Sequence, residues 1–185
     1  MLKVFAGVDL GTKCGISVLS GNSMYTHEIQ LGTSKKEPMR YVKFRNHVAS
    51  LLYALLEEYK PDEIVVFYEY VARHLGTKAA HAYGAYRMLL LMTCHELEIK
   101  TDYLSVQAIK KIATSNGAAK KNKMIESAKN RFKPDWKLTD NEADSMWISY
   151  LGREISNESF ETLEVSGPIK AYKRNGLVYS YADFE

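Results

Sequence analysis

Cysteine is scarce in this chain of 185 residues, and long hydrophobic runs are missing. The two cysteines, Cys14 and Cys94, belong to no Cys-x-x-Cys pair, so we expect reduced thiols without a catalytic role. The apolar stretch at residues 88–92 is too short to cross a bilayer. The N-terminal segment lacks the apolar region and cleavage site of a signal peptide. We therefore expect an intracellular, cytoplasmic protein with no membrane partner.

Internal repeats and low-complexity tracts are also missing, and 46% apolar with 25% charged residues is typical of a globular protein. The length fits one domain with a substantial core. Positive charge is concentrated in residues 110–137, where nine lysines and arginines stand against two acidic residues, while the whole chain carries only +3. A local excess of this kind favours binding to a polyanion.

The hydrophobic pattern predicts alternating strands and helices. The expected strands are residues 2–9, 15–20, 23–31, 63–69 and 99–104. The expected helices are one that Pro38 opens in its first turn, a long and well-buried one at 77–97, and three at about 105–114, 119–131 and 140–153. Thr139 and Glu142 have the spacing of a capping box for the last helix. This order predicts an α/β fold, with a mixed sheet covered by helices on both faces.

Three acidic residues stand where the predicted elements could bring them together. Asp9 ends the apolar run 4–8, Glu69 ends the run 64–68, and Asp144 lies one turn into a predicted helix. Two carboxylates ~4 Å apart repel by about 4 kcal/mol at an effective dielectric constant near 20, and divalent cations relieve that repulsion. Oxygen-rich sites suit Mg²⁺ or Mn²⁺. The pattern predicts a metal-dependent phosphoryl-transfer site that acts on nucleic acid.

Several motifs resemble the ribonuclease H-like nuclease superfamily. They are Gly-Val-Asp-Leu-Gly-Thr-Lys-Cys-Gly at 7–15, the strand-end Glu69, and Glu-Ala-Asp at 142–144. The segments 68–84 and 110–120 are similar to those of RuvC-type Holliday junction resolvases, especially small phage-type members. The resemblance spans about residues 3–152 and rests on the order and spacing of these motifs.

This resemblance implies a ribonuclease H-like five-stranded sheet in a nuclease domain at residues 1–154. It implies a homodimer that hydrolyses phosphodiester bonds in four-way junctions and other branched DNA, leaving 5′-phosphate ends. The cofactor would be Mg²⁺, with Mn²⁺ as a substitute and two ions per site, and no organic cofactor. The setting would be recombination and repair in a bacterial or phage-infected cell. Residues 155–185 would be an extension that binds DNA or lies at the sheet edge.

The family's metal ligands match Asp9, Glu69 and Asp144. A further acidic residue usually lies three positions before the last aspartate, where this chain has Asn141, preceded by Asp140. Both positions share a helical face with Asp144, so either residue could be the fourth ligand, and Asp140 also carries the charge that favours a catalytic role.

DNA contacts are expected from the basic stretch and from the segment after Glu69. The expected DNA-binding residues are Lys110, Lys111, Lys120, Lys121, Lys123, Tyr70, Arg73 and His74. Lys120 is also expected to act in catalysis by neutralising a phosphate. The family often has an aromatic wedge three residues after the glutamate, where this chain has Ala72. We therefore expect selection of DNA structure rather than strict sequence specificity.

Two alternatives remain open. The segment Asp9–Gly15 also resembles the first phosphate loop of actin-like ATPases and sugar kinases, although that fold normally needs two domains with the nucleotide between them. A catalytically silent protein that binds junctions as a scaffold is the other. The presence of all three carboxylates argues against it.

Overall fold

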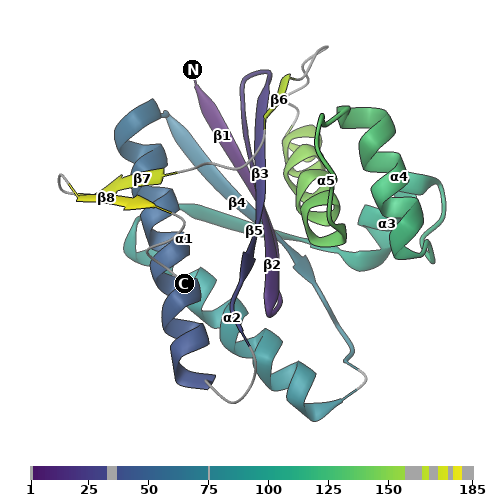
Figure 1. The fold of residues 1–185 in the computed structure, drawn as a ribbon, viewed down its shortest axis with the longest axis horizontal. Coiled ribbons are helices and arrows are strands. Elements are labelled where there is room, and N and C mark those ends of the chain that lie inside the picture. Colours follow the sequence, from purple (N-terminus) through teal and green to yellow (C-terminus); the bar gives the residue numbers. More distant parts are fainter. Residues whose placement is uncertain are drawn as a thin grey trace.

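The computed structural model describes residues 2–32, 37–74 and 76–156, together with three short strands between residues 164 and 180. Five longer strands form the centre of one sheet: β1 (Lys3–Asp9), β2 (Lys13–Ser20), β3 (Ser23–Gln30), β4 (Glu63–Tyr70) and β5 (Lys100–Ser105). The first three are antiparallel neighbours, whereas β4 and β5 run parallel to β1. This arrangement confirms the predicted mixed five-stranded sheet (Figure 1).

Three short strands follow the last helix. β6 (Glu164–Ser166) pairs in parallel with β3, so the full sheet order is β5-β4-β1-β2-β3-β6. β7 (Ala171–Arg174) and β8 (Leu177–Ser180) pair with each other in a separate two-stranded sheet. The extension therefore contributes one strand to the sheet edge, and its role in binding DNA stays a prediction.

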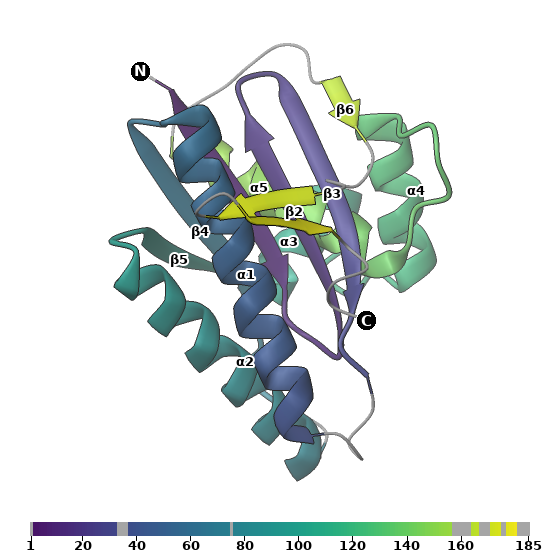
Figure 2. The same ribbon diagram turned by 60° about the vertical axis from the view of Figure 1, so that its left-hand side comes forward.

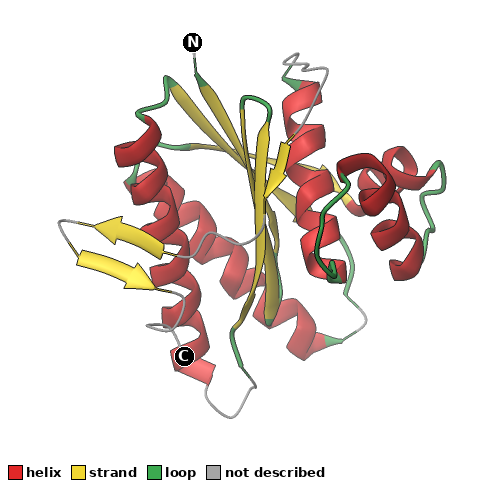
Figure 3. Cartoon of the chain, turned by 45° about the horizontal axis from the view of Figure 1, so that its top comes forward, coloured by secondary structure: helices red, strands yellow, loops and turns green. Residues whose placement is uncertain are grey.

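Helices cover both faces of the sheet, as the sequence predicts. α1 (Glu37–Tyr59) and α2 (Thr77–Glu96) pack on one face. α5 (Asp140–Ile155) packs on the other, with α3 (Val106–Thr114) and α4 (Lys121–Phe132) beside it. Figure 2 shows α1 in front of the strands and α5 behind them, and Figure 3 shows the same layers from another side. No helix in the described ranges is long and apolar enough to cross a membrane.

The central strands are apolar on both sides because both sides are covered. In β1, Val4, Ala6 and Val8 contact the α1–α2 layer, whereas Phe5 belongs to the cluster around α5. The continuous run of apolar residues before Asp9 is thus explained by two cores rather than one. Asp9 follows that run as the last residue of β1 and is half-buried.

Two glycines let α5 lie unusually close to the sheet. A Cβ atom at Gly7 of β1 would be 2.4 Å from the carbonyl oxygen of Ser145, and one at Gly15 of β2 would be 1.9 Å from that of Asn141. Both distances are shorter than any van der Waals contact allows. Only glycine at these positions permits the backbone of α5 to lie this close to β1 and β2.

The α2 helix differs from the expectation of a well-buried helix. Its buried residues, Tyr86, Leu90, Thr93 and Cys94, lie on one side. Met88 and Met92 are 57% and 51% exposed, one turn apart on another side. The prediction of a well-buried helix was based on apolar residues on all sides of α2, yet only one side of the helix contacts the core.

A buried histidine pair links the sheet to α1 and should make stability pH-dependent. The Nε2 atoms of His27 and His47 are 2.8 Å apart, so one ring donates and the other accepts. Burial lowers the pKa of His47 to about 4, and burial with His47 nearby lowers the pKa of His27. Because these pKa values lie below the unfolded value of 6.5, stability is full above pH 6.5 and falls towards pH 4.

We expect His47→Gln, which cannot titrate, to weaken this acid sensitivity. The stability that wild type loses between pH 7 and pH 4 through His47 is about 3 kcal/mol, at about 1.4 kcal/mol per pKa unit. Urea unfolding of both proteins at several pH values measures the difference. Parallel stability curves for wild type and His47→Gln would contradict this role of the pair.

Candidate active site

Two of the predicted carboxylates lie at neighbouring strand ends. β1 and β4 are parallel, and Val8 pairs with Tyr68, so Asp9 and Glu69 each follow that pair by one residue. Side chains alternate along a strand. Asp9 is therefore on the same face as Gly7, and Glu69 on the same face as Phe67, which is the face that α5 covers. The sheet thus presents both carboxylates towards one helix.

The start of α5 brings in the third carboxylate. The Thr139 hydroxyl accepts from the Glu142 backbone N–H at 3.2 Å, and the Glu142 carboxylate accepts from the Thr139 N–H at 2.9 Å. This capping box, which confirms the sequence prediction, begins the helix at Asp140. Because Gly15 pairs with Asp9 across the sheet and contacts Asn141, the first turn of α5 lies beside Asp9. Asp144 follows one turn later.

The three carboxylates influence one another. Burial raises the pKa of Asp9 well above its usual value, and the negative charges of Glu69 and Asp144 raise it further. Burial, followed by the charges of Glu69 and Asp140, raises the pKa of Asp144 to about 7. Burial raises the pKa of Glu69, and Lys110 opposes that change. The cluster therefore holds negative charge at a cost that a cation would relieve.

Lysines from α3 and α4 approach this cluster. Lys121, the first residue of α4, forms an ion pair with Asp140, and this contact lowers the pKa of Asp140. Lys110 of α3 lowers the pKa of both Glu69 and Asp144. In the sequence interpretation Lys121 was only a DNA contact and Lys120 the catalytic lysine. Lys120 lies exposed just before α4, and its catalytic role stays a prediction. The charge of Lys121, like that of Lys110, acts on the cluster.

The remaining predicted DNA-binding residues lie on α3, on α4 and at or just after the end of β4. Lys111 and Lys123 are exposed on α3 and α4. Tyr70 is the last residue of β4, and Arg73 is exposed in the following loop. The His74 ring packs on Tyr83, with centroids 4.8 Å apart. Their contacts with DNA stay predictions.

Tyr83 is a residue near the site that the sequence interpretation missed. Its hydroxyl donates to the Glu69 carbonyl at 2.7 Å and accepts from the Val71 N–H at 3.2 Å. It therefore holds the end of β4 against α2 at the residue that carries the second carboxylate. Nothing in the sequence signals this contact, because a tyrosine in an apolar helix is read as core.

An aromatic cluster lies on the other face of the same strand end. The rings of Tyr70 and Tyr103 have centroids 5.1 Å apart, and both residues are exposed. The guanidinium of Arg87 lies 5.6 and 5.5 Å from the ring centroids of Tyr68 and Tyr70, and its Nε donates to the Tyr68 hydroxyl at 3.1 Å. Exposed rings next to a cation are suited to stacking on nucleobases.

The chemistry of the donor set fits a divalent cation. Within the described ranges, no three His, Cys, Asp or Glu side chains are gathered closely enough to hold an ion as they stand. Asp144 Oδ1 is nevertheless buried without a hydrogen-bond partner among the described residues. A buried carboxylate oxygen without a donor costs free energy unless a cation or water meets it. Hard carboxylate oxygens of this kind are the ligands that Mg²⁺ and Mn²⁺ prefer.

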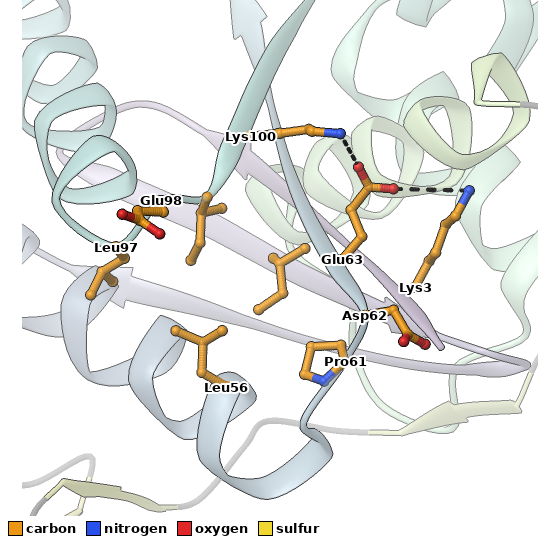
Figure 4. Close-up of a pocket in the computed structure, with 10 residues that line it drawn as sticks. Lys3, Leu56, Pro61, Asp62, Glu63, Leu97, Glu98 and Lys100 are labelled. Carbon is orange, nitrogen blue, oxygen red and sulfur yellow. Dashed lines mark hydrogen bonds and ion pairs between the residues drawn. The ribbon is translucent and has the colours of Figure 1, made fainter. Parts of the chain in front are cut away.

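A surface hollow of about 520 Å³ lies at the opposite end of the parallel strands. It is lined by the first residues of β1, β4 and β5, and Glu63 there pairs with both Lys3 and Lys100 (Figure 4). The two lysines of its lining are thus both paired with Glu63. The carboxylate cluster, at the carboxyl ends of β1 and β4, is therefore the better candidate for chemistry.

Known structures share this fold. T. thermophilus RuvC in complex with a Holliday junction substrate matches with a TM-score of 0.64 and 18% identity, over 84% of this chain and 94% of that chain. Thermus thermophilus RuvC matches at 0.61 and 17%, over 84% and 97%. The yeast mitochondrial Holliday junction resolvase Ydc2 matches at 0.51 and 13%, over 78% and 75%. No protein-family profile and no curated protein sequence matches the chain.

These matches show the fold class. The chain has the α/β ribonuclease H-like fold of RuvC-type resolvases, in agreement with the motifs at 7–15, Glu69 and 142–144. The match covers nearly the whole of each RuvC chain, so the core elements of that fold are present here.

Proposed function

We propose that this protein is a metal-dependent, structure-selective endonuclease that cleaves four-way junctions and other branched DNA. The observation that carries the proposal is the convergence of Asp9, Glu69 and Asp144 from two parallel strand ends and one helix. The fold shared with RuvC supports it, since one of those structures contains a Holliday junction substrate. The charges of Lys110 and Lys121, both in the basic stretch, act on the pKa of Asp144, and the exposed lysines of that stretch would supply a surface for a polyanion.

The residues would divide the work of phosphodiester hydrolysis. Asp9, Glu69 and Asp144 would hold Mg²⁺ or Mn²⁺, with Asp9 central because the charges of both Glu69 and Asp144 raise its pKa. Two such ions, when bound, supply an activated water and stabilise charge on the attacked phosphate. Lys110 and Lys121 lie where they can attract that phosphate. Water forms the new P–O bond, the bond to the 3′ oxygen breaks, and that oxygen takes a proton, leaving a 5′-phosphate.

DNA affinity would come largely from exposed lysines on α3 and α4, and it should depend on salt. Each phosphate contact contributes about 0.9 to the slope of log K against log salt concentration. We expect the combined change Lys111→Ala, Lys120→Ala and Lys123→Ala to lower that slope by up to about 3. Binding titrations of a junction from low to high salt measure it. Lys100→Ala, at the opposite end of the strands, is the control and should leave the slope unchanged.

A homodimer would bring two active sites to one junction. Its support is the resemblance to RuvC-type resolvases and the exposure of Met88 and Met92 on α2. Adjacent exposed methionines on a helix are typical of a contact surface. Analytical ultracentrifugation of the intact chain measures the stoichiometry. A monomer at all concentrations would contradict this part of the proposal.

Cleavage of a labelled four-way junction, compared with a linear duplex of the same sequence, tests the function. We expect paired nicks near the branch point with Mg²⁺ or Mn²⁺, no nicks with EDTA, and little cutting of the duplex. Binding without cutting in either metal would indicate a junction scaffold. Neither binding nor cutting, with a nucleotide-dependent rise in Tm, would indicate the actin-like alternative.

A further inference from the structure

A row of three paired residues crosses the sheet beside the carboxylate cluster. Asp9 of β1 pairs with Gly15 of β2, and Gly15 pairs with Glu28 of β3. Residues paired directly across a sheet carry their side chains on the same face. The Cβ position of Gly15 points at α5, so Asp9 and Glu28 flank a glycine on the face that α5 covers. The row therefore places a further carboxylate two strands from Asp9, about 10 Å away in the backbone.

Glu28 binds the asparagine in the first turn of α5. The Asn141 side-chain Nδ2 donates to Glu28 Oε2 at 2.5 Å, joining residues 113 positions apart. The other oxygen, Oε1, accepts from the side-chain amide of Gln30. An ionised carboxylate can only accept, so the amide atom of Asn141 that faces it is the nitrogen. The carbonyl oxygen Oδ1 is then the atom of this amide left to face elsewhere.

Asn141 precedes Asp144 by three residues, so the two side chains lie on one side of α5. Asp140 is engaged by Lys121. An amide oxygen is a hard, neutral donor that suits Mg²⁺ and Mn²⁺. Because Asp9, Glu69 and Asp144 already repel one another, a neutral oxygen adds a ligand without adding to that repulsion.

We propose that Glu28 is a positioning residue that holds the Asn141 amide so that Oδ1 serves the cation site of Asp9, Glu69 and Asp144. Glu28 acts through Asn141 and binds no ion itself. The inference rests on the proposed function, because it concerns the same site. It also answers the choice that the sequence left open between Asp140 and Asn141, in favour of Asn141.

The inference can be tested without any cleavage assay, by measuring Mn²⁺ binding through the electron paramagnetic resonance signal of the free ion. We expect Glu28→Ala and Asn141→Ala each to weaken Mn²⁺ binding by about tenfold, the lower range for residues that orient metal ligands. The double variant should bind Mn²⁺ no more weakly than Asn141→Ala does, because both changes remove the same contribution to binding. Glu57→Ala, an exposed glutamate on α1, is the matched control and should bind as wild type does.

Exchange of the donor and acceptor provides a second readout. Asn141→Asp sets two carboxylates against each other and should weaken Mn²⁺ binding. Adding Glu28→Gln restores one donor and one acceptor, and binding should recover by most of the loss. The comparison of Asn141→Asp with and without Glu28→Gln still tests the inference if Glu28→Ala fails to fold, which thermal unfolding will show.

Three results would overturn the inference: wild-type Mn²⁺ affinity in Glu28→Ala, losses that multiply in the double variant, or no recovery in the exchanged pair. If wild type binds Mn²⁺ and cuts junctions while any of these results is obtained, only the role of Glu28 is lost. If wild type neither binds Mn²⁺ nor cuts junctions, the result contradicts the proposed function as well as the role of Glu28.

Discussion

Replacing Asp144 with asparagine is expected to reduce junction cleavage by on the order of 10²- to 10³-fold, the range typical of removing one electrostatic contribution to a transition state. The same change should stabilise the metal-free protein. Asp144 has a pKa of about 7 in the folded chain and 3.8 as its ordinary value, so folding opposes its ionisation. Its contribution to stability is present below pH 4 and is lost as the pH rises through 7.

The stability effect of Asp144→Asn should therefore grow with pH in EDTA. Each pKa unit corresponds to about 1.4 kcal/mol, so the variant gains a few kcal/mol over wild type at pH 8 and little at pH 4. Mg²⁺ should raise the Tm of wild type at pH 8 and affect the variant less. Thermal unfolding of both proteins with EDTA and with Mg²⁺ measures these shifts.

Asp135→Asn removes the same charge from an exposed loop position and serves as the control, with cleavage and Tm near those of wild type. Retention of near-normal cutting by Asp144→Asn would remove Asp144 from the active site. A variant less stable than wild type at pH 8 in EDTA would show that the carboxylate is stabilised where it lies, contrary to its raised pKa.

Gly15→Ala is expected to destabilise the fold by about 3 kcal/mol or more and to impair cleavage. Its new Cβ atom would lie 1.9 Å from the carbonyl oxygen of Asn141 and 2.4 Å from its carbonyl carbon. Backbone atoms cannot rotate away as a flexible side chain can, so α5 must shift from the sheet. A shift there moves Asn141 and Asp144 away from Asp9, which stands opposite Gly15.

The measurement is chemical unfolding together with cleavage at a temperature where the variant stays folded. Gly84→Ala is the matched control, because no atom outside its own helix lies within 4 Å of the added Cβ, and alanine is favoured over glycine inside a helix by about 1 kcal/mol. We expect that variant to be as stable as wild type or more so. Wild-type stability and cutting in Gly15→Ala would show that α5 does not depend on this close approach.

Much of the fold could be predicted because its signals are local. The apolar runs before Asp9 and Glu69 mark strands that are buried on two sides, and β1 and β4 are such strands. Thr139 and Glu142 mark the start of α5 through a capping box that needs only four residues. The α2 helix was predicted with the wrong burial, because periodicity alone cannot tell which apolar residues will meet a partner.

The candidate site likewise has a part that the sequence predicts and a part that it does not. Asp9, Glu69 and Asp144 could be proposed from strand ends and motif spacing. The contact of Tyr83 with the Glu69 backbone could not, nor could the hydrogen bond between Glu28 and Asn141. These contacts join residues far apart in the chain, and no local pattern marks them. The nearness of Lys121, rather than Lys120, to the carboxylates depends on where α4 begins and how it packs on α5.

The sequence by itself determined the type and order of the elements and the carboxylates that end them, because hydrophobic period, helix caps and turns act over a few residues. Only the tertiary structure decided which side chains meet across β1, β2, β3 and α5. That outcome depends on the register of the strands and on Gly7 and Gly15, which leave room for the backbone of α5 against the sheet. Contacts of this kind arise when all the layers pack together.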